Sequence, residues 1–133
     1  MMTGLFGAIG IAGTGVTVHR KWLDTISDNI SNMNNVSPTS GPAFQERFVV
    51  AQPAVDNNGA QVGGIVLGDG TGRLVYEPDH PLADADGMVR YPDIDLGSQM
   101  SQMIMAQRGY QANLAVVDRA TDAYQAALQL GRG

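Results

Sequence analysis

Cysteine is absent from this 133-residue chain, which excludes disulfides, a zinc–thiolate site and a thiol nucleophile. Aromatic residues are scarce at 6%, and 8 basic residues face 13 acidic ones, for a net charge of −5. An acidic chain without a basic run is poorly suited to bind nucleic acid or an anionic membrane. The length excludes a large α/β barrel or a two-domain enzyme, whereas 44% apolar residues suffice for a small core.

The apolar stretch from Gly4 to Val18 lacks the features of a targeting segment. A secretory signal carries positive charge before its apolar region, but Arg20, the first basic residue, follows it. The stretch is also shorter than the roughly 20 residues that span a bilayer. We therefore expect neither a cleaved signal peptide nor a membrane anchor, which leaves a specialised export route open.

Three segments follow from charge and periodicity: 1–35, 36–91 and 92–133, with most of the acidic residues in the middle. Apolar residues recur every seven positions in the first segment, as in a coiled-coil seam. The two series are Ile9, Val16, Leu23 and Ile30, and Ala12, His19, Ile26 and Met33. We expect this helix to end near 32–35, because Asn favours turns and Ser37-Pro38 cannot continue a helix.

The third segment predicts a second helix over about 95–130, preceded by Asp93 and Asp95, where a helix N-terminus favours negative charge. Its two series are Leu96, Met103, Tyr110, Val117 and Tyr124, and Met100, Gln107, Leu114, Thr121 and Leu128. Gln and Ala dominate the remaining positions, which is unusual for a solvated face. The helix either packs against other subunits or is an ordinary amphipathic helix of an isolated hairpin.

Short β-like runs separated by turn residues fill the middle segment. They are residues 48–50, 64–67, 73–76 and 88–91. The predicted fold is therefore mainly α, with long terminal helices that pair as an antiparallel coiled-coil-like hairpin. A small β/loop insert is expected at the tip of that hairpin.

Candidate chemistry is sparse. His80 follows Asp79 in a proline-flanked loop, and His19 occupies a seam position, so neither has the pocket and oriented partner that a general base needs. Gly68 to Gly72 lacks the following Lys-Ser or Lys-Thr of a phosphate loop. We therefore predict no catalytic residue, no cofactor and no small-molecule substrate.

One acidic loop leaves an alternative open. Asp84, Asp86 and Gly87 match part of a calcium loop, but Leu82 at its first position has no ligand oxygen. A tight acidic turn is the simpler interpretation. The alternative function is a small calcium-binding or hydrolytic module centred on residues 79–95.

Both ends carry motifs that resemble the flagellar basal-body rod protein family. Residues 18–32 are similar to the N-terminal helix of flagellar rod and hook proteins, with Ser31 where Ala is usual. Residues 108–114 resemble the Tyr-x-Ala-Asn motif of their C-terminal helix, and residues 41–50 and 86–96 resemble the small proximal-rod subunits.

The resemblance implies a structural subunit, not an enzyme, that assembles helically with other axial proteins and transmits torque. It also implies type III export without a cleaved signal, and a location in the basal body, in the cell envelope outside the inner membrane. The implied partners are other rod proteins, the membrane ring and the export gate.

The two helices supply the predicted subunit interface. Its residues are Ile9, Val16, Leu23, Ile26, Asn29, Ile30, Asn32, Met103, Gln107, Tyr110, Asn113, Leu114, Val117 and Tyr124. The short amides of Asn29, Asn32 and Asn113 either bind between subunits or cap helix ends. Glycines near residues 7–15 would lower early helicity, so the ends are expected to fold fully only on assembly.

Overall fold

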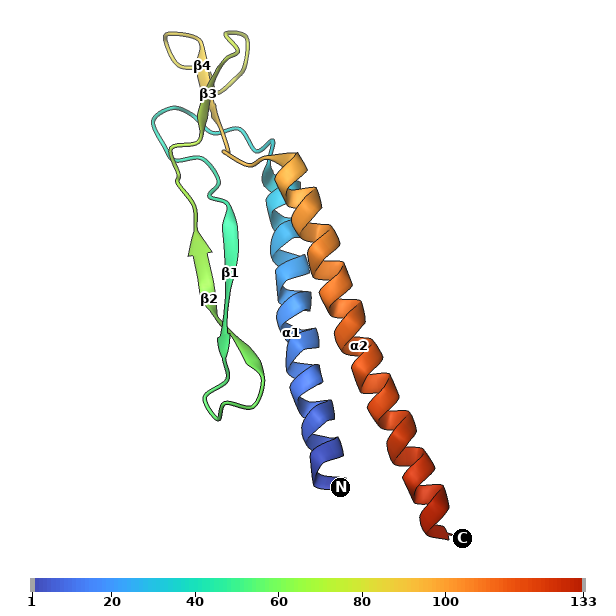
Figure 1. Ribbon diagram of the computed structural model, residues 1–133. Helices are drawn as coiled ribbons and strands as arrows, with labels where there is room; N and C mark the ends of the chain where they lie inside the picture. The colour runs from blue at the N-terminus through green and yellow to red at the C-terminus, as the bar shows by residue number, and fades with distance from the viewer. Residues whose placement is uncertain (1, 133) are drawn as a thin grey trace.

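The computed structural model describes residues 2–132 and has two long helices with two small β-hairpins between them (Figure 1). The elements are α1 (Met2–Asn32), β1 (Arg47–Pro53), β2 (Ala60–Leu67), β3 (Arg73–Tyr76), β4 (Met88–Tyr91) and α2 (Leu96–Arg132). This order confirms the predicted helix, small β insert and helix.

The helices α1 and α2 lie side by side and run in opposite directions. Asn29 contacts Gln99 near the loop end, and Phe6 contacts Tyr124 near the chain ends, with ring centroids 5.1 Å apart. Both termini consequently lie at the same end of the molecule (Figure 1).

Polar side chains cap the two helices where they face the insert. At the end of α1, the Asn32 amide donates to the carbonyl oxygen of Asp28 at 2.8 Å. At the start of α2, Asp95 accepts from the backbone N–H of Ser98 at 2.8 Å, as an N-cap residue does. Both ends therefore lie where turn and capping residues in the sequence predict them.

The strands form two separate antiparallel pairs. The β1–β2 pair, here called the ribbon, runs from Arg47 opposite Leu67 to Pro53 opposite Ala60, with a register shift between Val50 and Ala51. The β3–β4 pair is shorter.

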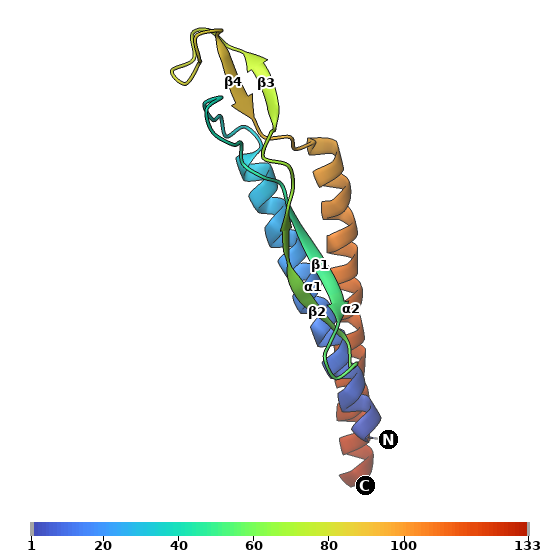
Figure 2. The ribbon, with the colours of Figure 1, turned by 90° about the vertical axis from the view of Figure 1, so that its left-hand side faces the viewer.

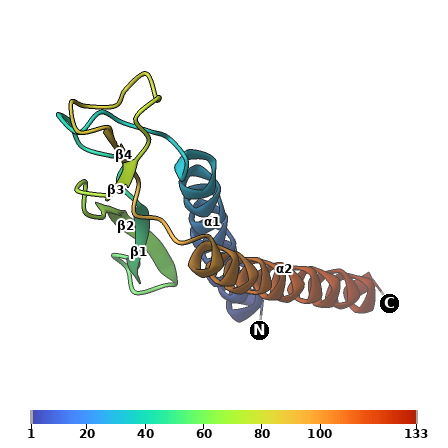
Figure 3. The same cartoon turned by 90° about the horizontal axis from the view of Figure 1, so that it is seen from above.

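The two hairpins take different places. The β3–β4 hairpin lies beyond the closed end of the helix pair, whereas the ribbon folds back along α1 (Figures 1 and 2). Seen from above, α1 lies between the ribbon and α2 (Figure 3). The prediction that the whole insert lies at the tip is therefore right only for β3–β4. The ribbon is held against α1 by hydrogen bonds to Asn29 and Thr14.

Arg90 joins the loops at the tip. Its backbone exchanges two hydrogen bonds with Ser37, and its guanidinium donates to the carbonyl oxygens of Thr39 and Thr71. The segment after α1 is thereby fixed to β4. The same loops and Arg90 line an open depression of ≈ 410 Å³. The guanidinium of Arg90 is already hydrogen-bonded to the loop carbonyls there.

The core is small and partly polar. Its largest fully buried side chains are Ile26, Gln99, Val89, Asn29 and Pro92. Two of these are amides, which must hydrogen-bond inside the protein to offset the loss of water. Within residues 2–132, neither helix combines the length and apolarity that a bilayer crossing requires.

Candidate subunit interface

The seam between the helices is built from small and amide residues. A Cβ at Gly15 would overlap the Asn113 side chain, and one at Gly109 would overlap the His19 ring. Ala12 and Ala106 are buried on the same faces. Small residues let two backbones approach closely. The absence of larger side chains at these positions therefore determines the distance between the two helices.

His19 and Trp22 pack in this seam. His19 Nδ1 lies 2.7 Å from the carbonyl oxygen of Gly15, which holds the ring in place above Gly109. Trp22 donates from Nε1 to the side-chain oxygen of Gln102 at 3.4 Å. This arrangement confirms the prediction that His19 has a packing role.

The heptad prediction for α2 is correct for one series and displaced for the other. In the first predicted series Met103, Tyr110, Val117 and Tyr124 are half-buried, but Leu96 at its start is exposed. In the second series only Leu114 is half-buried. Met100, Gln107, Thr121 and Leu128 are exposed. The inner positions lie one residue earlier, at Gln99, Ala106, Asn113 and Ala120. An apolar periodicity cannot detect these residues, because they are amides and alanines.

The predicted residues of α1 fall into three groups. Ile26 and Asn29 are 1% exposed, so their contacts here are within the chain, and Asn32 is half-buried at the helix end. The third group is half-buried and consists of Ile9, Val16, Leu23 and Ile30. At about 100° per residue, this group lies on the flank of α1 that borders α2 and faces away from the ribbon. Met103 and Leu114 lie on the corresponding flank of α2.

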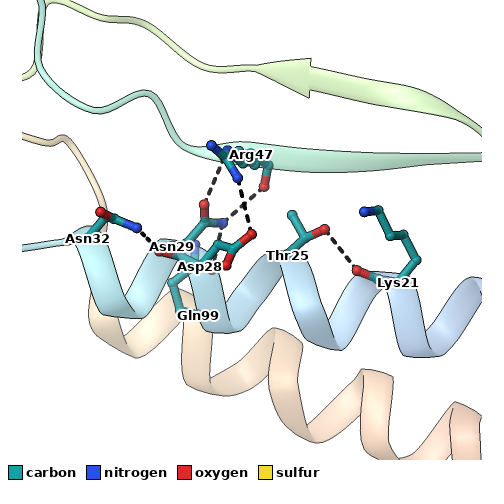
Figure 4. Close-up of polar contacts among 7 residues, drawn as sticks. All are labelled: Lys21, Thr25, Asp28, Asn29, Asn32, Arg47 and Gln99. Atoms are coloured by element: carbon teal, nitrogen blue, oxygen red, sulfur yellow. Dashed lines mark hydrogen bonds and ion pairs between the residues drawn. The ribbon is translucent and has the colours of Figure 1, made fainter.

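Asn29 joins three elements at one point (Figure 4). Its side-chain oxygen accepts from Arg47 N at 2.9 Å, while its Nδ2 donates to the Arg47 carbonyl at 3.0 Å and to Gln99 Oε1 at 3.2 Å. A carboxamide that pairs with both backbone groups of one residue imitates a strand neighbour. The first residue of β1 is therefore bonded to α1, and through Gln99 α1 is bonded to α2.

Glu46 adds a charge beside this cluster. Burial is the largest cause that raises the pKa of its carboxyl above the usual value. A hydrogen bond from Gln99 lowers the pKa, whereas the nearby carboxylates of Asp93 and Asp95 raise it further. The start of α2 is thus a local concentration of negative charge next to the buried amides.

The outer surface of α2 carries large apolar side chains that face solvent. They are Leu96, Met100, Ile104, Met105, Val116, Leu128 and Leu130. Charged residues are few along the helix, namely Arg108, Asp118, Arg119, Asp122 and Arg132. Such exposed apolar surface marks interaction sites. The predicted interface contains none of these residues, because it was chosen along the seam between the helices.

The acidic loop is a turn. Asp84 Oδ1 accepts from the backbone N–H groups of Asp86 and Met88, both at 2.9 Å, and its Oδ2 accepts from Thr39 at 2.7 Å. These hydrogen bonds hold the pKa of Asp84 below its usual value. Its oxygens are occupied, and residues 2–132 include no cluster of three or more metal-ligating side chains.

Comparisons with known proteins find relatives that match nearly the whole chain, both helices included. The family described as "Flagellar basal body rod FlgEFG protein C-terminal" matches residues 85–130, which include all but the end of α2. The flagellar basal-body rod protein FlgC of Yersinia enterocolitica is 33% identical over 96% of this chain and 98% of its own.

Other relatives match over the same extent. The FlgC protein of Salmonella typhimurium is 31% identical over 96% of this chain, and that of Borreliella burgdorferi is 32% identical over 98% of it. In both cases nearly the whole relative is covered. The calcium-binding or hydrolytic alternative has no support in these similarities. The chain belongs to the FlgC family of flagellar basal-body rod proteins.

Proposed function

We propose that this chain is a structural subunit of the flagellar basal-body rod and that it assembles with other rod components through the outside of its helix pair. The observation that carries the proposal is the exposed apolar surface of α2, from Leu96 to Leu130. A lone helix pair would gain little from such side chains in water, whereas neighbouring subunits would bury them.

The flank of the helix pair that faces away from the ribbon is the second contact surface. It consists of Ile9, Val16, Leu23, Ile30, Met103 and Leu114, all half-buried in the chain. We propose that a helix of a neighbouring subunit completes this flank in a coiled-coil-like manner. The 3–4 spacing of inward residues on both helices supports such packing.

Helical assembly of this kind would let the rod transmit torque without any chemical step. We further propose export without a cleaved signal, a location in the cell envelope outside the inner membrane, and contacts with the membrane ring and export gate.

A charge on the outer surface of α2 tests the assembly proposal. Met105 and Val116 are about half exposed, so Met105→Glu and Val116→Glu leave the fold intact while placing a carboxylate in the proposed interface. We expect loss of swimming in soft agar and basal bodies without an attached hook, when each variant replaces the wild-type protein in its host.

The matched control is Val55→Glu, because Val55 is 94% exposed at the far end of the ribbon. This control should swim like the wild type. Circular dichroism of the purified variants checks that the helices remain. Normal motility of both α2 variants would refute the proposed interface.

A further inference from the structure

The side of α1 covered by the ribbon is mostly polar. Thr14, Val18, Thr25 and Asn29 share this side, because their spacing of four and seven residues returns to the same face of a helix. Val18 is 8% and Thr25 is 4% exposed. Val18 is the one apolar side chain among the four, and Ile11, seven residues before it, stays 49% exposed. The ribbon therefore buries little apolar surface on α1, and hydrogen bonds must position it.

Fixed points exist at both ends of the ribbon. At the β1 start, Asn29 binds the backbone of Arg47, and Asp28 forms an ion pair with the Arg47 side chain at 3.1 Å (Figure 4). At the far end, the Ala60 N–H donates to Thr14 Oγ1 at 3.1 Å. Gly59, with φ of 104°, lies so close to Thr14 that a Cβ would overlap its hydroxyl.

The two fixed points match in length. Thr14 and Asn29 are 15 residues apart on α1, which is about 22 Å along a helix axis. On the ribbon, Ala60 lies opposite Pro53, and the steps of β1 from Arg47 to Pro53 span about 20 Å when extended. Strand and helix therefore run alongside each other without slack, and each holds the other in its extended or helical form.

We infer that the ribbon is an intramolecular strap that keeps residues 14–29 of α1 helical in the isolated subunit. Among the described side chains, those of residues 4–13 form no hydrogen bond with the ribbon, whose turn at Asp56 and Asn58 only lines an open hollow with Gly7, Gly10 and Ile11. A Cβ at Gly4, Gly7, Gly10 or Gly13 would meet no atom within 4 Å, and glycine is a poor helix former. Only the first three turns of α1 therefore become ordered when the subunit assembles.

This inference goes beyond the proposed function, because it concerns the lone chain and holds whatever that chain assembles into. It also restricts the expectation that both ends fold only on assembly: on α1, this now applies only to the residues before Thr14. In the isolated subunit, α1 has a part that both the ribbon and α2 hold and a part that α2 alone holds, with the boundary at Thr14.

Hydrogen exchange of the full-length monomer, followed by mass spectrometry at a dilution that keeps it monomeric, tests the strap. In the wild type, amides of residues 15–29 should exchange at least about tenfold more slowly than those of residues 4–13. Equal exchange in the two parts would overturn the inference.

The variant Thr14→Val removes the hydroxyl that accepts from Ala60. Loss of one such hydrogen bond should speed exchange of Ala60 and of residues 15–22 about fivefold. The matched control is Thr17→Val, because Thr17 is exposed and its hydroxyl likewise donates to its own helix, at Gly13. Thr17→Val should leave the exchange of Ala60 unchanged. Equal effects of the two variants would contradict the strap.

A second variant changes the ribbon alone. Gly59→Ala pushes the ribbon away from Thr14, and we expect faster exchange in α1 although α1 itself is unaltered. The control Gly64→Ala changes a ribbon glycine that also has a positive φ, of 155°, but has open space around it. Unchanged exchange of α1 in Gly59→Ala, with the ribbon shown to be detached by its own fast exchange, would refute the strap.

Discussion

The two covered sides of α1 are held in different ways. Toward α2, glycines and alanines bring the helices close, and rings and amides fill the remaining space. Toward the ribbon, side chains of α1 bind strand backbone at two separate points, Asn29 and Thr14. The first side is therefore sensitive to added volume, and the second is sensitive to lost hydrogen bonds.

Asn29 lies where the two sides meet, so its replacement should have the largest effect. Asn29→Leu leaves Arg47 N–H and C=O and the Gln99 side chain without their partner. We expect a loss of about 3 kcal/mol in the free energy of unfolding, measured by urea denaturation. The control Asn32→Leu removes an amide whose partners, Asp28 and Asn35, lie at the same helix end, and it should cost less than about 1 kcal/mol.

A loss of the same size in both variants would mean that the Asn29 cluster contributes no more than a helix-end amide. Asn29 would then not link the ribbon side and the α2 side of α1 energetically.

Gly109→Ala tests the volume limit of the seam. Alanine favours a helix over glycine by about 1 kcal/mol, but its methyl group would overlap the His19 ring, which is held at Gly15. Overpacking of this kind costs about 1–3 kcal/mol, so we expect net destabilisation of about 1 kcal/mol by thermal unfolding.

Gly97 provides the control on the same helix. A Cβ at Gly97 would lie 3.5 Å from the Asp95 carboxylate, an ordinary contact, so Gly97→Ala should be neutral or stabilising. If Gly109→Ala were also stabilising, the seam would have room to spare, and its small residues would not set the distance between the helices.

Periodicity and turn chemistry predicted the order of all elements and the approximate bounds of both helices, β3 and β4, whereas β1 and β2 are about twice as long as the predicted runs 48–50 and 64–67. They also predicted the inward series through Met103 and Tyr110. Of the other inward series only Asn113 was named, as an interface amide, and the series as such was not recognised because its two amides, Gln99 and Asn113, interrupt the apolar pattern. The position of the ribbon along α1 could not be predicted from the sequence. Asn29 binds the backbone of Arg47, and a contact to backbone requires no particular side chain in the strand.

Glu46 is the source of the smallest expected effect, which depends on pH. Because its pKa is raised in the folded chain, proton binding favours folding, and this contribution is lost as pH rises through the folded pKa. Glu46→Gln keeps an oxygen that can accept from Gln99 but removes the charge near Asp93 and Asp95. The variant should therefore have a higher urea midpoint than the wild type at about pH 7, with the difference shrinking toward about pH 4.

Asp24→Asn, at an exposed carboxylate of α1, measures the effect of removing one negative charge far from the cluster. A higher urea midpoint in Glu46→Gln alone would show that the ionised Glu46 carboxylate destabilises the fold through its burial and its two neighbouring carboxylates. An equal gain in both variants would assign it to the net charge of −5 instead. In that case the carboxylates at the start of α2 would not affect the stability of the polar cluster at Asn29. The hydrogen bonds of Asn29 alone would then account for the contact among α1, β1 and α2.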